Sequence, residues 1–358
     1  MAYSIKGLPW QYKGSKDVTQ CKTSTEVIKA AQLDWEVKKA EMVAKMPLSF
    51  NMDKNLDDLN DAKKRDKDAH IIGKNIYARC DNQFCTYRDD YKIPLGMVKN
   101  KYTIVQNDAA FKFFDNVIGE NAAIWQTAGF FGNGERIFVS AKLPDNILVK
   151  GDPVENYLVF TNSHDGSSGV KILFTPIRVV CQNTLNAAIR TSSNCFSIRH
   201  TESVHKNIEI AHEVLGIAKQ KIKDTQWAYD ILAGIKLTDE DVMEYICKNN
   251  LSDAEIDTLS STGHTYKELV YRNGLAVSDV GVSTRKLNVI TDTWDYYHVG
   301  IGQHEIAGTA WGAFNAISGY YSNVDNSEGS KRMDSLLYND KAKKLERALN
   351  FDFAKMLS

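Results

Sequence analysis

The strongest constraint on the fold is a series of short apolar runs in the middle of the chain, separated by turn signals. The runs are rich in β-branched and aromatic residues, which is typical of strands. The Gly-Asn-Gly sequence at 132–134 and the Asp-Gly pair at 165–166 predict tight turns, because Asp-Gly accommodates a positive φ. We therefore predict an antiparallel β-meander in which Pro176 breaks the last strand. Its runs cover residues 123–131, 135–143, 155–162 and 169–175, and an extended piece follows at 177–181.

Helices are expected on either side of this meander. Asn107 can cap a helix over 107–118, because the apolar residues from Ala110 to Val117 recur at helical spacing and Gly119 supplies a stop. Asn183 can cap a second helix, over 184–190. We expect the core to be a hairpin, a helix, the meander and a helix.

The N-terminal segment has three predicted parts. Thr23 and Glu26 have capping-box spacing and start a helix over 23–31. Residues 50–70 are dense in Asn, Asp and Lys and predict a mobile loop. Residues 75–88 predict a hairpin around the polar turn at 81–83.

The chain becomes helical beyond residue 200. A helix-period stripe runs within 202–233, and the acidic residues after Thr238 favour another helix start. Further helices are expected near 253–260, 265–273, 305–320 and 340–357. The predicted fold class is α+β, an antiparallel β-meander with flanking helices plus a helical C-terminal half. We divide the chain into an N-terminal helical arm and mobile polar loop, an α+β core and a mainly helical C-terminal region, with bounds 1–74, 75–200 and 201–358.

Charge and composition narrow the class of protein. The 358 residues carry 44 Lys and Arg against 45 Asp and Glu, a formal charge of −1, which excludes a globally basic coating protein. No apolar run is long enough to span a bilayer, and the first residues lack the apolar core of a signal peptide. The six cysteines are sparse and contain no C-x-x-C pair. We expect reduced thiols, a location in the cytoplasm of a host cell, and no membrane partner.

Several kinds of enzyme chemistry lack their motifs. There is no phosphate-binding G-x-x-x-x-G-K-[ST] sequence, no H-E-x-x-H and no G-x-S-x-G elbow. Zinc would need close Cys or His ligands, and the candidates, Cys80 with Cys85 and His200 with His205 and His212, have no matching spacing. We expect no cofactor, no metal and no catalytic residue.

The most informative stretch is 171–206, which holds five basic residues and one acid, Glu202. Guanidinium groups bind phosphate oxygens in bidentate fashion, so a cationic strip can follow a nucleic-acid backbone without reading its sequence. The predicted nucleic-acid-binding residues are Lys171, Arg178, Arg190, Arg199, His200 and Lys206.

Two alternatives remain open for these residues. Arg178 lies inside an apolar run, so it also fits a structural role in a pair with a carboxylate. Trp125, Phe130 and Phe131, near Arg136, form a second candidate surface on which bases could stack. Aromatic residues in a meander more often pack in the core, and we favour packing for these.

The sequence resembles a family of uncharacterised phage- and plasmid-encoded proteins described as a domain of unknown function. The resemblance rests on residues 101–107, 162–166, 199–201, 308–311 and 315–316, and above all on the block Thr-Pro-Ile-Arg-Val-Val-Cys-Gln-Asn-Thr-Leu at 175–185. It covers nearly the whole chain and implies a mobile-element context, without a known activity.

The order of elements is also similar to the β-β-β-α core of single-strand annealing proteins, the phage Red-beta-like and eukaryotic recombination-mediator group. That resemblance implies a positively charged groove for the DNA backbone, with Arg178, Arg190 and Arg199 as the cations by position, and subunits assembled into rings or filaments. We therefore expect an ATP-independent, phage-associated protein that binds single-stranded DNA, forms a homo-oligomer through its meander and promotes annealing or recombination.

Two other functions stay open at this point. The first is a protein-interaction module that targets a host factor. The second is a metal-dependent nuclease or hydrolase centred on His164, Asp165 and Asp152.

Overall fold

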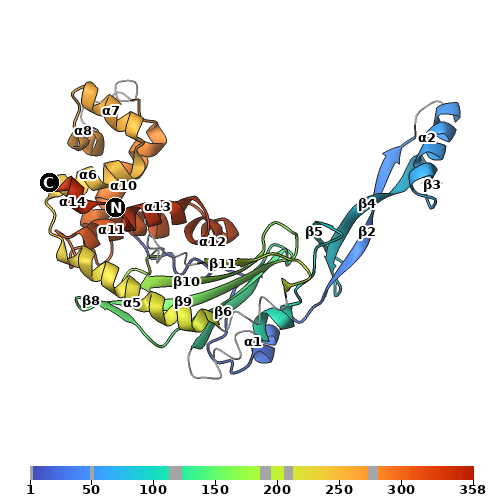
Figure 1. Ribbon diagram of the computed structural model, residues 1–358, viewed down its shortest axis with the longest axis horizontal. Coiled ribbons are helices and arrows are strands. Elements are labelled where there is room, and N and C mark those ends of the chain that lie inside the picture. The colour runs from blue at the N-terminus through green and yellow to red at the C-terminus, as the bar shows by residue number, and fades with distance from the viewer. Residues whose placement is uncertain (1–2, 49–51, 113–122, 186–194, 205–212, 273–280) are drawn as a thin grey trace.

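The computed structural model describes residues 3–48, 52–112, 123–185, 195–204, 213–272 and 281–358 (Figure 1). Two antiparallel sheets are followed by a helical C-terminal half, so the predicted α+β class is confirmed. Within these ranges no helix has the length and apolar character needed to cross a membrane.

The larger sheet contains the predicted meander. Its strand order is β1-β6-β7-β9-β10-β11, β8 pairs with β9, and every pairing is antiparallel. Strand β11 was not predicted. The strands are β1 (Lys16–Asp17), β6 (Ile124–Phe131), β7 (Arg136–Lys142), β8 (Ile147–Val149), β9 (Asp152–Ser163), β10 (Val170–Arg178) and β11 (Cys195–Ile198).

Pro176 does not break the fourth predicted strand, because β10 continues through it to Arg178. The carbonyl of Pro176 accepts a hydrogen bond from the backbone N–H of Leu185 at 3.0 Å, on the side away from β9. A strand residue directs its N–H and C=O to the same side, so the missing N–H of Pro176 removes no bond to β9.

The smaller sheet extends from the body as a long projection (Figure 1). Its order is β2-β4-β3, and β5 pairs with β4. We call residues 37–88 the arm. The arm contains β2 (Val37–Pro47), α2 (Met52–Arg65), β3 (His70–Ile72) and β4 (Asn75–Arg88), and β5 (Pro94–Lys99) completes the sheet outside the arm.

The predicted hairpin over 75–88 is wrong, because β4 is one strand of 14 residues. The polar residues that we took for a turn form a bulge, in which residues 80–83 lie opposite the single residue Met42. Asn82 has a φ of 57°, a conformation that asparagine tolerates in bulges as well as in turns. The turn-forming residues therefore interrupt the hydrogen-bond ladder, but they do not reverse the direction of the chain.

The predicted loop over 50–70 is also wrong, because α2 occupies most of it. Leu59 and Ala62 are half-buried and three residues apart, as expected on one helical face. This helix packs on β4 of a narrow ribbon, so it needs far fewer apolar residues than a helix on a large core. Composition alone therefore misled the prediction.

Both faces of the larger sheet are covered. On one face, Phe160 and Ile172 pack with α1 (Ser24–Ala30) and the helical residues 107–112. On the other face, Trp10 and Met333 of α12 (Gly329–Leu337) lie in one cluster with residues of β7, β9 and β10. The predicted helix at 23–31 is confirmed, with Thr23 accepting the N–H of Glu26.

The helical half packs around Trp311, Phe314 and Tyr245 and shares this core with β8. Capping boxes at Thr238, Ser252 and Thr265 start three of its helices. Helices α10 and α12 were not predicted. The elements are α5 (Glu213–Gly234), α6 (Asp239–Asn250), α7 (Asp253–Ser261), α8 (Tyr266–Tyr271), α10 (Thr284–Val299), α11 (Ala310–Gly319), the π-helix η1 (Tyr320–Val324), α13 (Asp340–Leu349) and α14 (Phe353–Met356).

Some predicted helical residues lie outside the described part of the chain. They are 113–118 with the stop at Gly119, residues 186–190 of the helix predicted over 184–190, and residues 205–212. Thr184, where that helix was expected to begin, instead forms an antiparallel bridge with Ile177.

The two sheets meet where Gly96 of β5 contacts the β9–β10 turn. A Cβ atom on Gly96 would lie 2.5 Å from the Asp165 Cα atom, which is backbone and cannot rotate away. We predict that Gly96→Ala lowers the free energy of unfolding by about 1–3 kcal/mol through overpacking, as measured by urea denaturation. Gly234→Ala is the control, because a Cβ there meets open space and alanine favours a helix. Equal stability of the two variants would contradict this prediction.

Candidate nucleic-acid interface at the root of the arm

A hollow of about 430 Å³ lies where the arm joins the body. Three segments that are distant in the sequence line it: the end of β5 and the turn after it, the β9–β10 turn, and the residues that follow β11. We call it the cationic hollow. Its residues are Met97, Val98, Lys99, Lys101, Tyr102, Gly166, Ser168, Gly169, Arg199, His200 and Thr201.

Tyr102 and His200 hold the wall of the hollow together. Their rings stack with centroids 4.5 Å apart, and the Tyr102 hydroxyl donates to the Ser163 carbonyl at 2.6 Å. The Thr103 N–H donates to the His200 carbonyl, and His200 Nδ1 bonds the Thr103 carbonyl at 3.0 Å. Burial lowers the pKa of His200. At neutral pH this histidine therefore stiffens the wall and adds no charge.

Lys39 of β2 fixes the turn that carries the two hollow lysines. Its Nζ donates to the carbonyls of Asn100 and Tyr102. Burial lowers the pKa of Lys39. The arm therefore positions one side of the hollow directly.

Two glycines allow the β9–β10 turn to approach its neighbours. A Cβ on Gly169 would lie 2.4 Å from the Ile198 carbonyl oxygen. Gly166 has a φ of +77°, and a Cβ there would lie 3.1 Å from Val98 Cγ1. Larger residues at these positions would push the turn away from β5 and β11 and widen the hollow.

Three exposed cations, Lys99, Lys101 and Arg199, surround this neutral wall. Among the described residues, no carboxylate lies within ion-pair distance of any of them. Asp165 adjoins the hollow, but its Oδ1 accepts from the Ser163 hydroxyl at 2.5 Å and the Ser167 N–H at 2.9 Å. Burial opposes ionisation of Asp165, yet these hydrogen bonds outweigh it and hold its pKa below the ordinary value.

Of the four predicted binding residues that the structure describes, Arg199 and His200 line this hollow. Lys171 instead lies 4.4 Å from the centre of the Tyr338 ring, just beyond α12. Arg190 and Lys206 lie outside the described residues. Lys99 and Lys101 were missed. The available signal was the Lys-Asn-Lys sequence at 99–101, which lies outside the strip over 171–206.

The prediction that Arg178 contacts phosphate is wrong, because Arg178 is an internal structural residue. Its side chain is fully buried, and its Nε donates to Asp152 Oδ2 at 2.7 Å. Its Nη2 donates to the Gly302 carbonyl at 2.9 Å, and Trp311 Nε1 donates to the same carboxylate oxygen at 2.9 Å. This agrees with the alternative in which Arg178 pairs with a carboxylate inside the protein.

The residues of the proposed nuclease centre do not meet. The His164 ring is fully buried, with its Nε2 2.9 Å from Asn107 Oδ1. Asp152 begins β9 and His164 follows its end, so about 3.3 Å per residue places them well over 30 Å apart. No group of three or more His, Cys, Asp or Glu side chains suited to a metal ion occurs in the described part of the chain.

The aromatic residues considered for base stacking pack internally. Trp125 and Phe131 are buried, and Phe130 is half-buried beneath the Arg88 guanidinium, 5.3 Å from its ring centre. This agrees with the packing interpretation.

We predict that Arg178→Met lowers the free energy of unfolding by about 3–5 kcal/mol, because it leaves the Asp152 carboxylate buried without its cation. The double variant Arg178→Met/Asp152→Asn should recover part of this loss, since it removes the unpaired charge. Arg199→Ala on the surface should change stability by no more than about 0.5 kcal/mol. Urea denaturation measures all three. A double variant less stable than Arg178→Met would show that the ion pair is not the cause.

Burial lowers the pKa of His164 from 6.5 to about 3. Between pH 6.5 and about pH 3, His164 is protonated in the unfolded chain but neutral in the folded chain. Protonation therefore favours the unfolded state, and the free energy of unfolding falls as the pH drops through this range. We predict that the free energy of unfolding declines from pH 7 to pH 5, by up to about 1.4 kcal/mol per pH unit for each such histidine.

His164→Gln should make this decline shallower, as measured by denaturant unfolding at each pH. His304→Gln, at an exposed histidine, is the matched control. An unchanged pH dependence in His164→Gln would show that His164 does not cause the loss of stability at low pH.

A comparison with models of protein families matches residues 94–349 to DUF932, described as a domain of unknown function. The match includes the whole cationic hollow and the Arg178 network, and it excludes the arm. No curated protein and no solved structure shows a significant match. The expected resemblance to an uncharacterised domain family is confirmed. Because the matched region covers more than half of its length, the chain belongs to the DUF932 family.

Proposed function

We propose that this protein binds the backbone of single-stranded DNA in the cationic hollow and promotes strand annealing without ATP. The observation that carries the proposal is the gathering of Lys99, Lys101 and Arg199 from two distant parts of the chain around one neutral wall. The phage or plasmid setting belongs to the same proposal.

The chemistry of the hollow suits phosphate groups. Arg199 can make two parallel hydrogen bonds to one phosphate, while the lysines act as compact point charges. Ser168 and Thr201 add neutral hydroxyl groups beside them. Such a lining holds a sugar-phosphate backbone without reading the base sequence.

The proposal revises the site expected from the sequence. The strip over 171–206 divides, with Arg178 inside the protein, Lys171 against Tyr338, and Arg199 at the root of the arm. The local cationic surface therefore depends on the approach of β5 to the β9–β10 turn, which brings in two lysines from outside the strip.

A protein-interaction role remains the second candidate function. The arm favours it, because the arm carries exposed apolar side chains that the DNA proposal does not use. The two functions are compatible in one molecule, since the hollow and the distal part of the arm are separate surfaces.

The test is fluorescence anisotropy with a labelled single-stranded oligonucleotide over a range of salt concentrations. Each phosphate contact on a single strand contributes about −0.7 to the slope of log affinity against log salt. We predict that Lys99→Ala/Lys101→Ala/Arg199→Ala weakens binding and flattens this slope by about 2 in total. Annealing of complementary strands, measured without ATP, should slow in parallel.

Lys267→Ala is the matched control, because this lysine is exposed on α8, far along the chain from the hollow. It should leave both affinity and slope unchanged. The proposal fails if the wild-type protein does not bind at low salt, or if the triple variant binds with the affinity and slope of the wild type.

A further inference from the structure

The distal arm exposes an unusual share of apolar surface. Val43 is 52% exposed and Ile72 is 57% exposed on one face of the ribbon, and Met46 and Ile71 are exposed on the other face. A narrow ribbon in water has little core of its own, and clustered exposed apolar side chains mark interaction sites. This part of the molecule therefore has the properties of a docking surface.

The ribbon has two different faces. Successive side chains of a strand point to opposite sides, so Val43 and Lys45 of β2 share one face, and Ala44 and Met46 share the other. The register pairs Lys45 with Tyr77, and Tyr77 with His70. Ile72 lies opposite Asn75, two residues from Tyr77, and so joins the face of Lys45. We call this the outer face of the arm, and the side toward α2 the arm groove.

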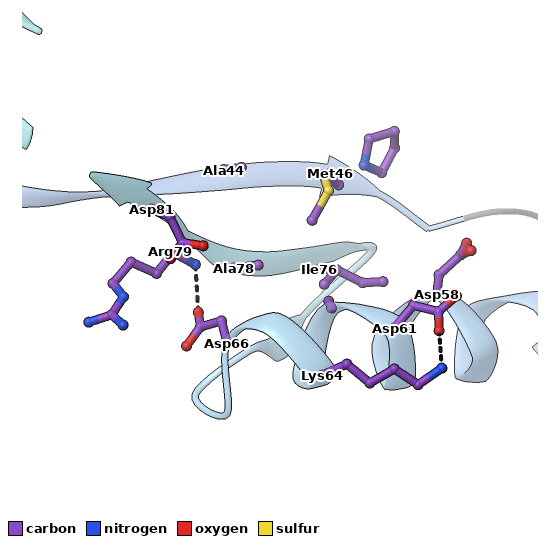
Figure 2. A pocket seen from close by; sticks show the side chains of 12 residues that line it. Ala44, Met46, Asp58, Asp61, Lys64, Asp66, Ile76, Ala78, Arg79 and Asp81 are labelled. Carbon is purple, nitrogen blue, oxygen red and sulfur yellow. Dashed lines mark hydrogen bonds and ion pairs between the residues drawn. The ribbon is translucent and has the colours of Figure 1, made fainter. Parts of the chain in front are cut away.

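The arm groove is apolar at its base and acidic at its rim. It encloses about 700 Å³ between α2 and the ribbon, with Met46, Ile76 and Ala78 along the strands (Figure 2). Four carboxylates and two cations also line it, Asp58, Asp61, Asp66 and Asp81 with Lys64 and Arg79, so acidic groups are in excess. Asp61 pairs with Lys64, but neither Asp58 nor Asp81 has an ion pair with any residue whose side chain the structure describes.

The outer face has the complementary character. Val43 and Ile72 supply exposed apolar side chains, and Lys45 between them is exposed. Within the described residues Lys45 has no carboxylate at ion-pair distance, whereas Arg79 is paired with Glu41 at 3.2 Å. One face therefore offers a cation among apolar groups, and the other offers carboxylates around an apolar floor.

We propose that the arm is a self-association element, in which the outer face of one copy docks in the arm groove of a second copy. Lys45 of one copy then meets Asp58 and Asp81 of the next, and the exposed apolar side chains cover one another. A second copy is the occupant that the charges favour, because both complementary faces belong to the same segment.

The contact joins two different surfaces, so each added copy leaves one outer face and one groove unoccupied. Such a heterologous contact builds a ring when the rotation closes and a filament when it does not. Both faces of the larger sheet already pack against described helices or the N-terminal segment.

The experiment measures mass in solution by light scattering for the full chain and two defective variants. Lys45→Glu keeps an intact groove, and Asp58→Lys/Asp81→Lys keeps an intact outer face. The wild type should give multiples of the chain mass, and each variant alone should give one chain. An equimolar mixture of the two variants should give assemblies in which the variants alternate, because the outer face of each variant is complementary in charge to the groove of the other.

The charge-swapped chain Lys45→Glu/Asp58→Lys/Asp81→Lys should regain the larger assemblies, which also shows that the substitutions do not prevent folding. Lys67→Glu, at another exposed lysine of the distal arm, is the control and should behave as the wild type. A monomeric wild type, variants that assemble normally, or a mixture that stays monomeric would each overturn the proposal. The variant without the hollow cations should assemble normally while losing DNA affinity, so the two proposals can fail separately.

Discussion

The buried contact between Arg178 and Asp152 joins the two halves of this molecule. Arg178 ends β10 and Asp152 begins β9, and both reach the helical half, through the Gly302 carbonyl and Trp311 Nε1. A buried guanidinium and carboxylate cannot separate without leaving a charge unpaired in the interior, which is far more costly than losing a surface pair. The orientation of the helices relative to the sheet is therefore set at this point.

The polar residues that follow Arg178 extend the same connection. Asn183 donates to the Asn315 carbonyl, the Thr184 N–H donates to the Ser322 hydroxyl, and Asn323 donates to the Cys181 carbonyl. Buried polar side chains need partners, so this block has a structural reason for its Arg and Asn residues. The longest motif of the chain is explained by packing between its halves, and the candidate interface lies elsewhere.

Sequence patterns predicted the elements whose signals are local. The meander followed from apolar runs between turns, and the acidic residues after Thr238 marked a helix start, where the structure has α6. Predictions failed where the structure of a segment depends on the other segments that it packs against. The bulge at Asn82 has the composition of a turn, and α2 is too polar to be recognised without the ribbon it packs on. The sequence did not predict the cationic hollow for the same reason, because Lys99 and Arg199 come together only through tertiary contacts.

The position of the hollow links the two proposals physically. It lies at the root of the arm, and Lys39 of β2 holds its lysine-bearing turn in place. An assembly built through arms would repeat the hollow once per copy, so a single strand could contact several hollows in succession. Affinity for the backbone would then rise with strand length and with assembly, because each added hollow binds at the high effective concentration set by its neighbours. The hollow lies within the family match and the arm lies outside it, so the two proposals concern different parts of the chain.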